Sequence, residues 1–237
     1  MIIVVGRGHG GTRIMSEALS KAGVFMGRVN VSGDLIPAKP MYEAVKIAGR
    51  RVRYLRCQTP GIGRHAWDFS ALVNSEPDLQ YVKLVHKYLA AIGDAHEPKG
   101  FKLPETVLAF PWIVKMFPDA HYIHWTRDPR DNIAGAHMTD MLHKFGVSNS
   151  RVQNILEARL ESWVYHQEIV RATPRPKNMI DVRFEDFLLK NDQERARLSK
   201  FLGFELPKVR VNPRRIGHDR QSTSAIVPAK LLARYGY

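Results

Sequence analysis

The sequence predicts an α/β fold, a mostly parallel sheet flanked by helices, in a single domain over residues 1–237. Short runs of β-branched and aromatic residues, such as 2–5 and 121–126, alternate with longer stretches of helical periodicity. Such alternation is typical of a parallel sheet covered by helices on both faces. Segments rich in glycine or arginine follow two of these strands, and ligands of such folds bind at the carboxyl ends of the strands.

The first of these segments, residues 6–12 (GRGHGGT), lies between the apolar run 2–5 and a helical stretch over 13–22. Glycines let the backbone turn sharply and approach a ligand closely. Successive N–H groups and the positive end of the following helix can then surround an anion. The order strand, glycine loop, helix therefore predicts a loop that binds the phosphate groups of a nucleotide.

Three interpretations of this loop differ in the ligand. Residues 6–11 match the dinucleotide fingerprint G-x-G-x-x-G, and Asp34 lies at a suitable distance to bind a ribose. The loop of nucleoside-triphosphate enzymes requires Lys followed by Ser or Thr, where this chain has Thr12-Arg13, so a standard kinase or ATPase is disfavoured. A glycine-rich turn without any ligand is the third alternative.

Glycine and proline mark the ends of several helices. Gly23 ends the first helix, and Ser75 with Pro77 marks the start of a helix that runs to about residue 92. The remaining expected elements are a short strand over 24–26, a loop over 27–40, a basic helix over 41–56, a loop over 57–67, a strand over 100–104, a helix over 106–116, a helix ending near 146, a helix over 152–170, a strand over 179–184 and a helix over 191–202.

Charge and composition restrict the function classes. Lys and Arg outnumber Asp and Glu by 36 to 23, a formal charge of +13, which favours a polyanionic partner. The single cysteine, Cys57, excludes an internal disulfide framework. No apolar run is long enough to span a membrane, and the N-terminus lacks a signal-peptide profile, so we expect a cytoplasmic protein. His121 and His124 point to opposite faces of a strand, and no metal-ligand motif occurs, so the sequence predicts no metal site.

Three further segments carry chemistry suited to an anionic ligand. Residues 127–131 (RDPRD) place Arg127 at a strand end before a helix, and a guanidinium can bind a phosphate through two hydrogen bonds. Residues 181–187 (DVRFEDF) end the strand at 179–184, and the following helix ends in Phe-Leu-Gly. Residues 214–217 (RRIG) add two adjacent arginines near the C-terminus.

These four segments, in this order, resemble those of the P-loop sulfotransferases that use 3′-phosphoadenosine 5′-phosphosulfate (PAPS). The loop Gly-His-Gly-Gly-Thr-Arg is similar to the family's 5′-phosphosulfate loop, and Arg127 to the arginine of its 3′-phosphate motif. The family has Ser eight positions after that arginine, where this chain has Gly135, and Tyr near the adenine, where it has Phe184. The segment 214–217 is similar to the Arg-Lys-x-Gly segment that closes over the 3′-phosphate.

The resemblance implies a sulfotransferase-like fold, PAPS as co-substrate, no metal, and transfer of a sulfuryl group to an acceptor hydroxyl or amine. The residues that it assigns to the donor are Arg7, Gly8, Gly10, Gly11, Thr12, Arg13, Arg127, Phe184, Arg214, Arg215 and Gly217.

The resemblance also assigns catalytic roles. His9 stands where the family has a Lys or Arg that stabilises the leaving group, and Arg7 or Arg13 is an alternative source of that charge. Lys102 matches a lysine near the transferred sulfate. The general base is expected among three carboxylates, with Asp34 preferred over Glu43 and Glu105 because its loop precedes the family's acceptor-binding helix.

Two other functions stay open at this point. One is an NAD(P)-dependent oxidoreductase that uses the literal G-x-G-x-x-G, and the other is a non-catalytic nucleotide-binding protein of sulfotransferase descent. The positive charge also permits a nucleic-acid binder, but no recognised nucleic-acid motif occurs, so we expect no such partner. The sequence identifies neither the acceptor nor the oligomeric state.

Overall fold

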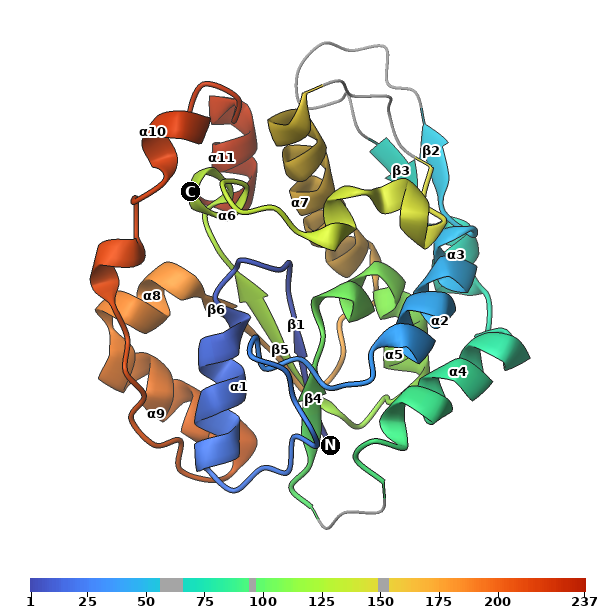
Figure 1. The fold of residues 1–237 in the computed structure, drawn as a ribbon, viewed down its shortest axis with the longest axis horizontal. Helices are drawn as coiled ribbons and strands as arrows, with labels where there is room; N and C mark the ends of the chain where they lie inside the picture. Colours follow the sequence, from blue (N-terminus) through green and yellow to red (C-terminus); the bar gives the residue numbers. More distant parts are fainter. Residues whose placement is uncertain (56–65, 94–96, 149–153) are drawn as a thin grey trace.

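A four-stranded parallel sheet lies at the centre of the molecule, which is described by a computed structural model (Figure 1). Its strands lie in the order β4 (Gly100–Lys102), β1 (Ile2–Val5), β5 (His121–Thr126) and β6 (Met179–Arg183). The predicted α/β fold class is thereby confirmed. The residues that the structure describes are 1–55, 66–93, 97–148 and 154–237.

Strand β1 lies inside the sheet, and all four of its residues are buried. Ile3 and Val5 belong to the apolar core on one face, while Ile2 and Val4 belong to the core on the other. Because both faces are covered, the strand is apolar at every position and not only at alternate ones. This burial fixes the end of β1, and with it the start of the glycine loop.

Helices cover both faces of the sheet (Figure 1). The face with Ile3 packs against α2 (Lys39–Gly49), α4 (Leu79–Leu89), α5 (Phe110–Met116) and α7 (Ile155–Ala172). The opposite face packs against α1 (Thr12–Lys21), α8 (Phe184–Leu189) and α9 (Asn191–Leu202). The shorter elements are β2 (Arg53–Leu55), β3 (Ala66–Asp68), α3 (Ser70–Asn74), α6 (Pro129–Asn132), α10 (Arg220–Thr223), α11 (Ala229–Tyr235) and the 3₁₀ turns Pro104–Ala109, Met138–Asp140, Leu142–Phe145 and Pro213–Arg215.

Two predicted elements in the first third of the chain are wrong. Residues 24–26 form no strand but one isolated bridge, between Phe25 and Lys99. The basic helix over 41–56 ends at Gly49, and β2 then pairs antiparallel with β3. Tyr54 of β2 packs on Trp67 of β3, with ring centroids 6.1 Å apart. This cross-strand contact outweighs the helical preference of the arginines around it.

Other boundaries differ by a few residues. The helix expected from Ser75 begins at Leu79, because the Ser75 carbonyl accepts a hydrogen bond from Trp112 Nε1 at 3.1 Å and is held outside the helix. The expected helix over 106–116 is a 3₁₀ turn followed by α5. The helix over 191–202 is confirmed, and α7 begins after Asn154, whose side chain accepts from Leu156 N–H. Most of the predicted loop over 57–67 lies outside the described residues.

Candidate active site

The glycine loop between β1 and α1 packs tightly against the end of β5. Trp125 Nε1 donates to the Gly10 carbonyl at 2.7 Å. A Cβ at Gly6 would lie 2.4 Å from the Trp125 carbonyl oxygen. Gly11 has a φ of +89°, and a Cβ there would lie 2.6 Å from the Phe184 ring. Only glycine fits at these two positions, so the sequence of the loop follows from its contacts.

The N-terminus of α1 opens directly from this loop. No side chain caps the helix, and no acidic residue lies in its first turn. The first N–H groups of a helix have no partner within it and carry a partial positive charge. Loop and helix together therefore favour an anion next to Gly11 and Thr12.

A cavity of about 820 Å³ lies on one side of the loop, and we name it the basic cavity. Gly11, Ile14 and Phe184 form part of its wall. Its most frequent residue is arginine, at positions Arg13, Arg127, Arg210, Arg214 and Arg215. So many guanidinium groups around one space favour a ligand with several negative charges.

Arg127 connects the loop to the C-terminal part of this cavity. Its Nη1 donates to the His9 carbonyl and its Nη2 to the Arg215 carbonyl, both at 3.0 Å. The guanidinium lies over the Phe184 ring, 4.5 Å from the centroid. Nε of Arg127 is buried without a partner among the described residues. The side chain is thus held in place by two backbone carbonyls and by the Phe184 ring.

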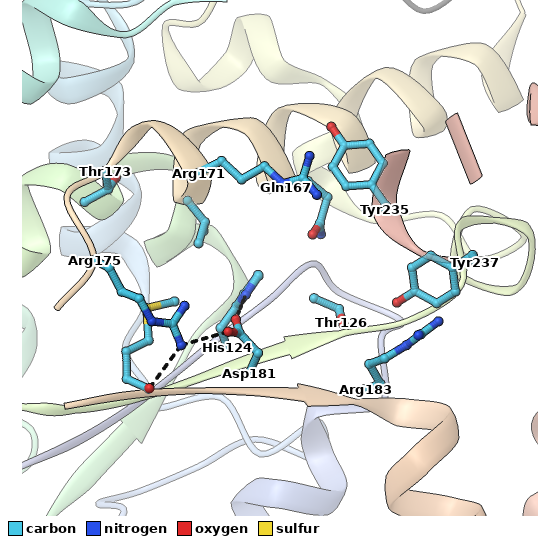
Figure 2. Close-up of a pocket in the computed structure, with 12 residues that line it drawn as sticks. His124, Thr126, Gln167, Arg171, Thr173, Arg175, Asp181, Arg183, Tyr235 and Tyr237 are labelled. Atoms are coloured by element: carbon cyan, nitrogen blue, oxygen red, sulfur yellow. Dashed lines mark hydrogen bonds and ion pairs between the residues drawn. The ribbon is translucent and has the colours of Figure 1, made fainter. Parts of the chain in front are cut away.

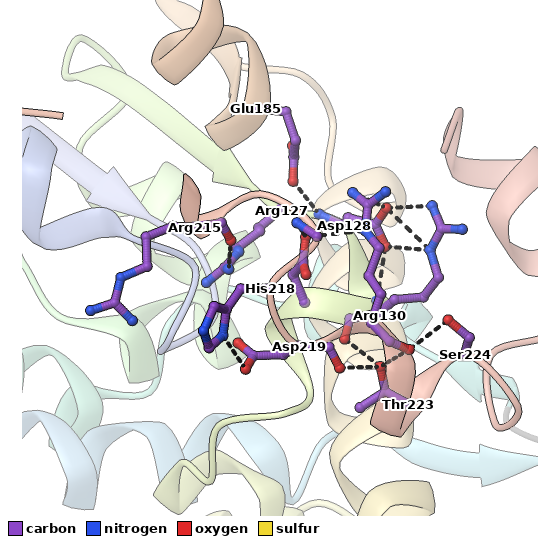
Figure 3. A network of polar contacts seen from close by, with 12 residues as sticks. Arg127, Asp128, Arg130, Glu185, Arg215, His218, Asp219, Thr223 and Ser224 are labelled. Carbon is purple, nitrogen blue, oxygen red and sulfur yellow. Dashed lines mark hydrogen bonds and ion pairs between the residues drawn. The ribbon is translucent and has the colours of Figure 1, made fainter. Parts of the chain in front are cut away.

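Residues 213–224, which we name the strap, bring Arg214 and Arg215 to the basic cavity. The strap also joins a network of polar contacts with residues 127–130 (Figure 3). Arg220 forms ion pairs with two buried carboxylates, Asp128 at 3.0 Å and Asp131 at 3.2 Å. The strap is further fixed by two hydrogen bonds, from Gly217 N–H to Asp131 at 2.9 Å and from the Thr223 hydroxyl to the Arg130 carbonyl at 2.5 Å.

A second cavity, of about 330 Å³, lies on the other side of the loop, and we name it the loop cavity. It shares Gly11 and Arg13 with the basic cavity. The other residues that line it are Gly8, His9, Thr12, Ser32, Asp34, Lys102, Pro104 and His137. The structure therefore brings together the three residues predicted to be catalytic, His9, Asp34 and Lys102.

Lys102 and Asp34 form an ion pair inside the loop cavity. Lys102 is buried, and its Nζ also donates to the Ser32 carbonyl at 2.7 Å. Burial lowers the pKa of Lys102, and the charge of Asp34 opposes that shift. The ammonium group thus faces the cavity with a carboxylate as its partner.

Comparison with known proteins identifies the family. The model of the sulfotransferase family matches residues 2–208. The chain belongs to the sulfotransferase family. No curated protein sequence matches this chain.

Solved sulfotransferase structures have the same fold. The sulfotransferase domain from the curacin biosynthetic pathway is 12% identical with a TM-score of 0.56, and the match covers 100% of this chain and 97% of that one. Sulfotransferase STF9 from Mycobacterium avium is 13% identical with a TM-score of 0.52, over 99% of this chain and 75% of that one. The sulfotransferase domain of the Synechococcus PCC 7002 olefin synthase is 13% identical with a TM-score of 0.52, over 100% and 94%.

The position of Asp34 disagrees with the dinucleotide interpretation. In that interpretation Asp34 binds a ribose. In the structure of this protein, Asp34 is instead paired with Lys102 in the loop cavity. Among the described residues, no three metal-ligating side chains gather at one place, and no helix is long and apolar enough to cross a bilayer.

Arg7, Gly10 and Gly217, all predicted to bind the donor, line neither cavity, and the Gly10 N–H donates to the Arg7 carbonyl at 3.2 Å. Arg7 is buried and forms an ion pair with Asp140, and its Nη1 donates to the Asn132 side chain at 3.0 Å. Gly217 has a φ of +76° and anchors the strap through Asp131. Arg7 and Gly217 therefore stabilise the loop and the strap around the cavities, through contacts with other parts of the chain.

Glu105 lies behind the loop cavity and is only 1% exposed. Burial, reinforced by Asp34, raises the pKa of Glu105 to about 7. Its Oε1 is 3.7 Å from Nε2 of His137, and its Oε2 has no partner among the described residues. Burial and the charge of Arg7 lower the pKa of His137 to about 3, so this imidazole is neutral at pH 7.

Replacing Glu105 by glutamine is expected to remove a pH dependence of stability. The pKa of about 7 in the folded state exceeds the value of about 4.3 in an unfolded chain. The folded state thus holds this proton more tightly, and the contribution of Glu105 to the free energy of unfolding falls as the pH rises from about 5 to about 8. Measured by urea unfolding, the free energy of unfolding of Glu105→Gln relative to that of the wild type should rise by on the order of 2 kcal/mol between about pH 5 and about pH 8. A constant difference between the two proteins would contradict this assignment.

Gly135 and His9, two departures from the family pattern, are in contact with each other. A Cβ at Gly135 would lie 2.5 Å from Cγ and Nδ1 of the His9 ring. His9 itself has a φ of +59°, in the left-handed region that side chains rarely adopt. The imidazole therefore needs the glycine, and the two positions are coupled.

Gly135→Ser is accordingly expected to displace the His9 ring. It should also lower the affinity for adenosine 3′,5′-bisphosphate, the nucleotide that remains when PAPS loses its sulfuryl group. Because the clash is with one side chain, the second change His9→Ala should restore much of the binding. Calorimetric titration of the wild type, both single variants and the double variant gives the coupling energy, expected at about 1–2 kcal/mol. Additive effects would show that the two residues are independent.

Sequence reasoning missed several residues that line the cavities, among them Ser32, His137, Arg210 and Asn212. His137 follows the arginine motif by ten positions, and a 3₁₀ turn that begins at Met138 presents its ring to the loop cavity. Arg210 precedes the predicted segment 214–217, and its charge was a usable signal. The other two lie in loops whose course depends on tertiary contacts.

Proposed function

We propose that this protein transfers a sulfuryl group from PAPS to a hydroxyl or amine group of an acceptor. The observation that carries the proposal is the meeting of two cavities at one glycine loop, an arginine-rich one and one lined by Lys102 in an ion pair with Asp34. PAPS carries negative charge at both ends of its adenosine, so a donor that lies across the loop matches this distribution.

The basic cavity is the proposed place for the adenosine 3′-phosphate. Arg127, Arg214 and Arg215 surround the space, and Phe184 offers an apolar ring for the base. The 5′-phosphosulfate would then bind at the loop, through the N–H groups of Gly11, Thr12 and Arg13 at the start of α1, while the Gly10 N–H stays bonded to the Arg7 carbonyl. The sulfuryl group would face the loop cavity, where the acceptor binds.

The proposed step is an in-line displacement at sulfur. The acceptor oxygen or nitrogen forms a bond to sulfur while the bond from sulfur to the 5′-phosphate oxygen breaks. His9 and Arg13 stabilise the electron pair that remains on that oxygen. Lys102 leaves Asp34 and binds a sulfuryl oxygen, and the freed Asp34 carboxylate accepts the proton of the acceptor. Glu105 is the alternative base, held behind the cavity.

A non-catalytic nucleotide-binding protein is the second candidate. It is favoured by His9, which stands where the family loop has a Lys or Arg. The charge of an imidazole depends on pH, whereas Lys and Arg are permanent cations. In this case the protein binds adenosine 3′,5′-bisphosphate without turning over PAPS.

Transfer of labelled sulfate from PAPS tests the proposal directly. The purified protein is incubated with ³⁵S-labelled PAPS and mixtures of carbohydrate, peptide, phenol and alkyl alcohol acceptors, and labelled products are separated. Product that depends on Lys102 supports the enzyme, with Lys115→Ala as a matched control because Lys115 pairs with exposed Glu76 far from either cavity. Binding of the bisphosphate without any labelled product would favour the second candidate, and absence of binding would refute both.

A further inference from the structure

A third cavity, of about 430 Å³, lies along β6 on the face of the sheet that α7 covers, and we name it the β6 cavity (Figure 2). It shares no lining residue with the basic cavity or the loop cavity. The proposed transfer reaction therefore makes no use of it. Its volume falls within the range of about 300–1,000 Å³ that is usual for small-molecule sites.

The wall of this cavity is polar where a sheet face is normally apolar. His124 of β5 and Asp181 of β6 face the cavity, whereas their neighbours Ile123 and Val182 point to the opposite face and are fully buried in the core. Gln167 of α7 contributes another buried polar side chain. A sheet face beneath a helix is ordinarily filled by apolar side chains, so this polar wall indicates contact with water or with a polar ligand.

The charges on the wall do not balance. Three arginines line the cavity, Arg171, Arg175 and Arg183, against one carboxylate, Asp181. Asp181 is engaged by His124 Nδ1 and by Arg175, each at 2.8 Å (Figure 2). Both contacts hold the pKa of Asp181 down at about 2, with His124 as the larger cause. Asp181 therefore neutralises Arg175 and leaves the other two cations.

Arg171 and Arg183 are held by aromatic rings and by few hydrogen-bond acceptors. Each guanidinium lies over a tyrosine ring, that of Arg171 over Tyr235 and that of Arg183 over Tyr237, both 4.2 Å from the centroid. Arg171 donates to the Arg234 carbonyl at 3.1 Å. Among the described residues no carboxylate lies within 4.0 Å of Arg183, and its Nε is buried without a hydrogen-bond partner.

Two carboxylates outside the wall, Glu168 and Glu185, form no ion pair with Arg183 among the contacts of the described residues. Glu168 binds Arg234 and the Tyr235 hydroxyl. Glu185 accepts a hydrogen bond from the Asp128 N–H through Oε1 at 2.9 Å, its Oε2 has no partner among the described residues, and burial raises its pKa. A partly buried guanidinium is stable when its donors are satisfied, and the part of the chain that the structure describes supplies no hydrogen-bond acceptor to Nε of Arg183.

We propose that the β6 cavity binds a small organic anion. Its acidic group, a carboxylate, sulfate or phosphate, is held by Arg183 and Arg171, with His124 and Gln167 as polar neighbours. The apolar part of the ligand contacts Val170 and Met179, which line the same wall. Because the lining residues differ from those of the proposed transfer site, binding here and binding of the nucleotide are separate events.

The test uses nuclear magnetic resonance on protein saturated with adenosine 3′,5′-bisphosphate, so that the basic cavity is filled before an anion is added. Sulfate, acetate and benzoate are titrated while the ring signals of His124 and the Nε–H signal of Arg171 are followed. We expect saturable shifts for all three anions, with benzoate binding more tightly than acetate because its ring adds apolar contact. Arg183→Gln should weaken each at least tenfold, and Arg53→Gln, at an exposed arginine 74% accessible, should change nothing.

Three outcomes would overturn the proposal. Shifts that rise linearly with anion concentration would indicate ionic strength only. Equal affinities in Arg183→Gln and the wild type would remove Arg183 from the site. Movement of the same signals by the bisphosphate alone, with no further change on adding anion, would assign the cavity to the nucleotide site. If Arg183→Gln unfolds, Arg183→Lys and Arg171→Gln test the same contacts.

Discussion

Arg127→Ala is expected to weaken the binding of adenosine 3′,5′-bisphosphate by about 100-fold, or about 3 kcal/mol. The guanidinium lines the basic cavity, and each of its terminal nitrogens carries a second N–H besides the one donated to a backbone carbonyl, so it can donate to a phosphate without losing these two backbone contacts. A charge-assisted bidentate contact is about twice as strong as a neutral hydrogen bond. Calorimetric titration of the bisphosphate into the wild type and the variant measures the loss.

Two controls separate this effect from damage to the fold. Arg127→Lys keeps the charge but not the planar pair of donors, so it should fall between the wild type and the alanine variant. Arg53→Ala removes an exposed charge far from the cavity and should bind like the wild type. Thermal unfolding of each variant shows whether the contacts to His9 and Arg215 are needed for stability. Unchanged affinity in a folded Arg127→Ala protein would contradict the placement of the 3′-phosphate.

Asp34→Asn is expected to lower kcat by about 10²–10⁴-fold while the affinity for adenosine 3′,5′-bisphosphate changes less than about twofold. Asparagine keeps the shape of the side chain but accepts no proton at neutral pH. Its amide still reaches Lys102, so the loss should come from the chemical step more than from the geometry of the cavity. Steady-state kinetics with an acceptor found in the labelled screen, together with calorimetry, separate the two effects.

Glu105→Gln is the matched variant for this experiment. The two carboxylates lie on the same side of the loop, but Glu105 is buried behind the wall that Asp34 forms. If Asp34 is the base, Glu105→Gln should keep kcat within about tenfold of the wild type. If kcat instead falls with Glu105→Gln, and the fall in activity of the wild type below pH 7 follows the pKa of Glu105, the proton passes to Glu105.

A strand could be predicted from the sequence where burial on both faces makes all of its residues apolar. The apolar run at 2–5 identifies a strand covered on both faces, and the glycines after it follow from contacts with Trp125 and Phe184. The strand β2 has no such apolar run, and it forms because it pairs with β3, which follows it at a distance in the sequence. Only the tertiary structure reverses the helical preference of the arginines in this segment.

The sequence predicted which charged residues belong to the candidate site, but not which way their side chains point. Arg7 and Arg13 both belong to the glycine loop, yet Arg13 lines both cavities and Arg7 is turned inward to Asp140, more than a hundred positions away. His137 was missed for the same reason, since its place at the loop cavity depends on a turn after α6. Residue type alone does not indicate which side of a loop a side chain occupies.

The strap gives the basic cavity a thermodynamic property as well as a shape. Arg220 and the Thr223 hydroxyl join the strap to α6, the helix that directly follows Arg127. Arg127 and Arg215, from two distant parts of the sequence, are thereby fixed relative to one another. They are held by the ion pairs of Arg220 with two buried carboxylates and by the hydrogen bond from Arg127 Nη2 to the Arg215 carbonyl. The loss of conformational entropy needed to gather these cations occurs during folding, so a nucleotide meets a preorganised surface and retains more of its interaction energy as affinity.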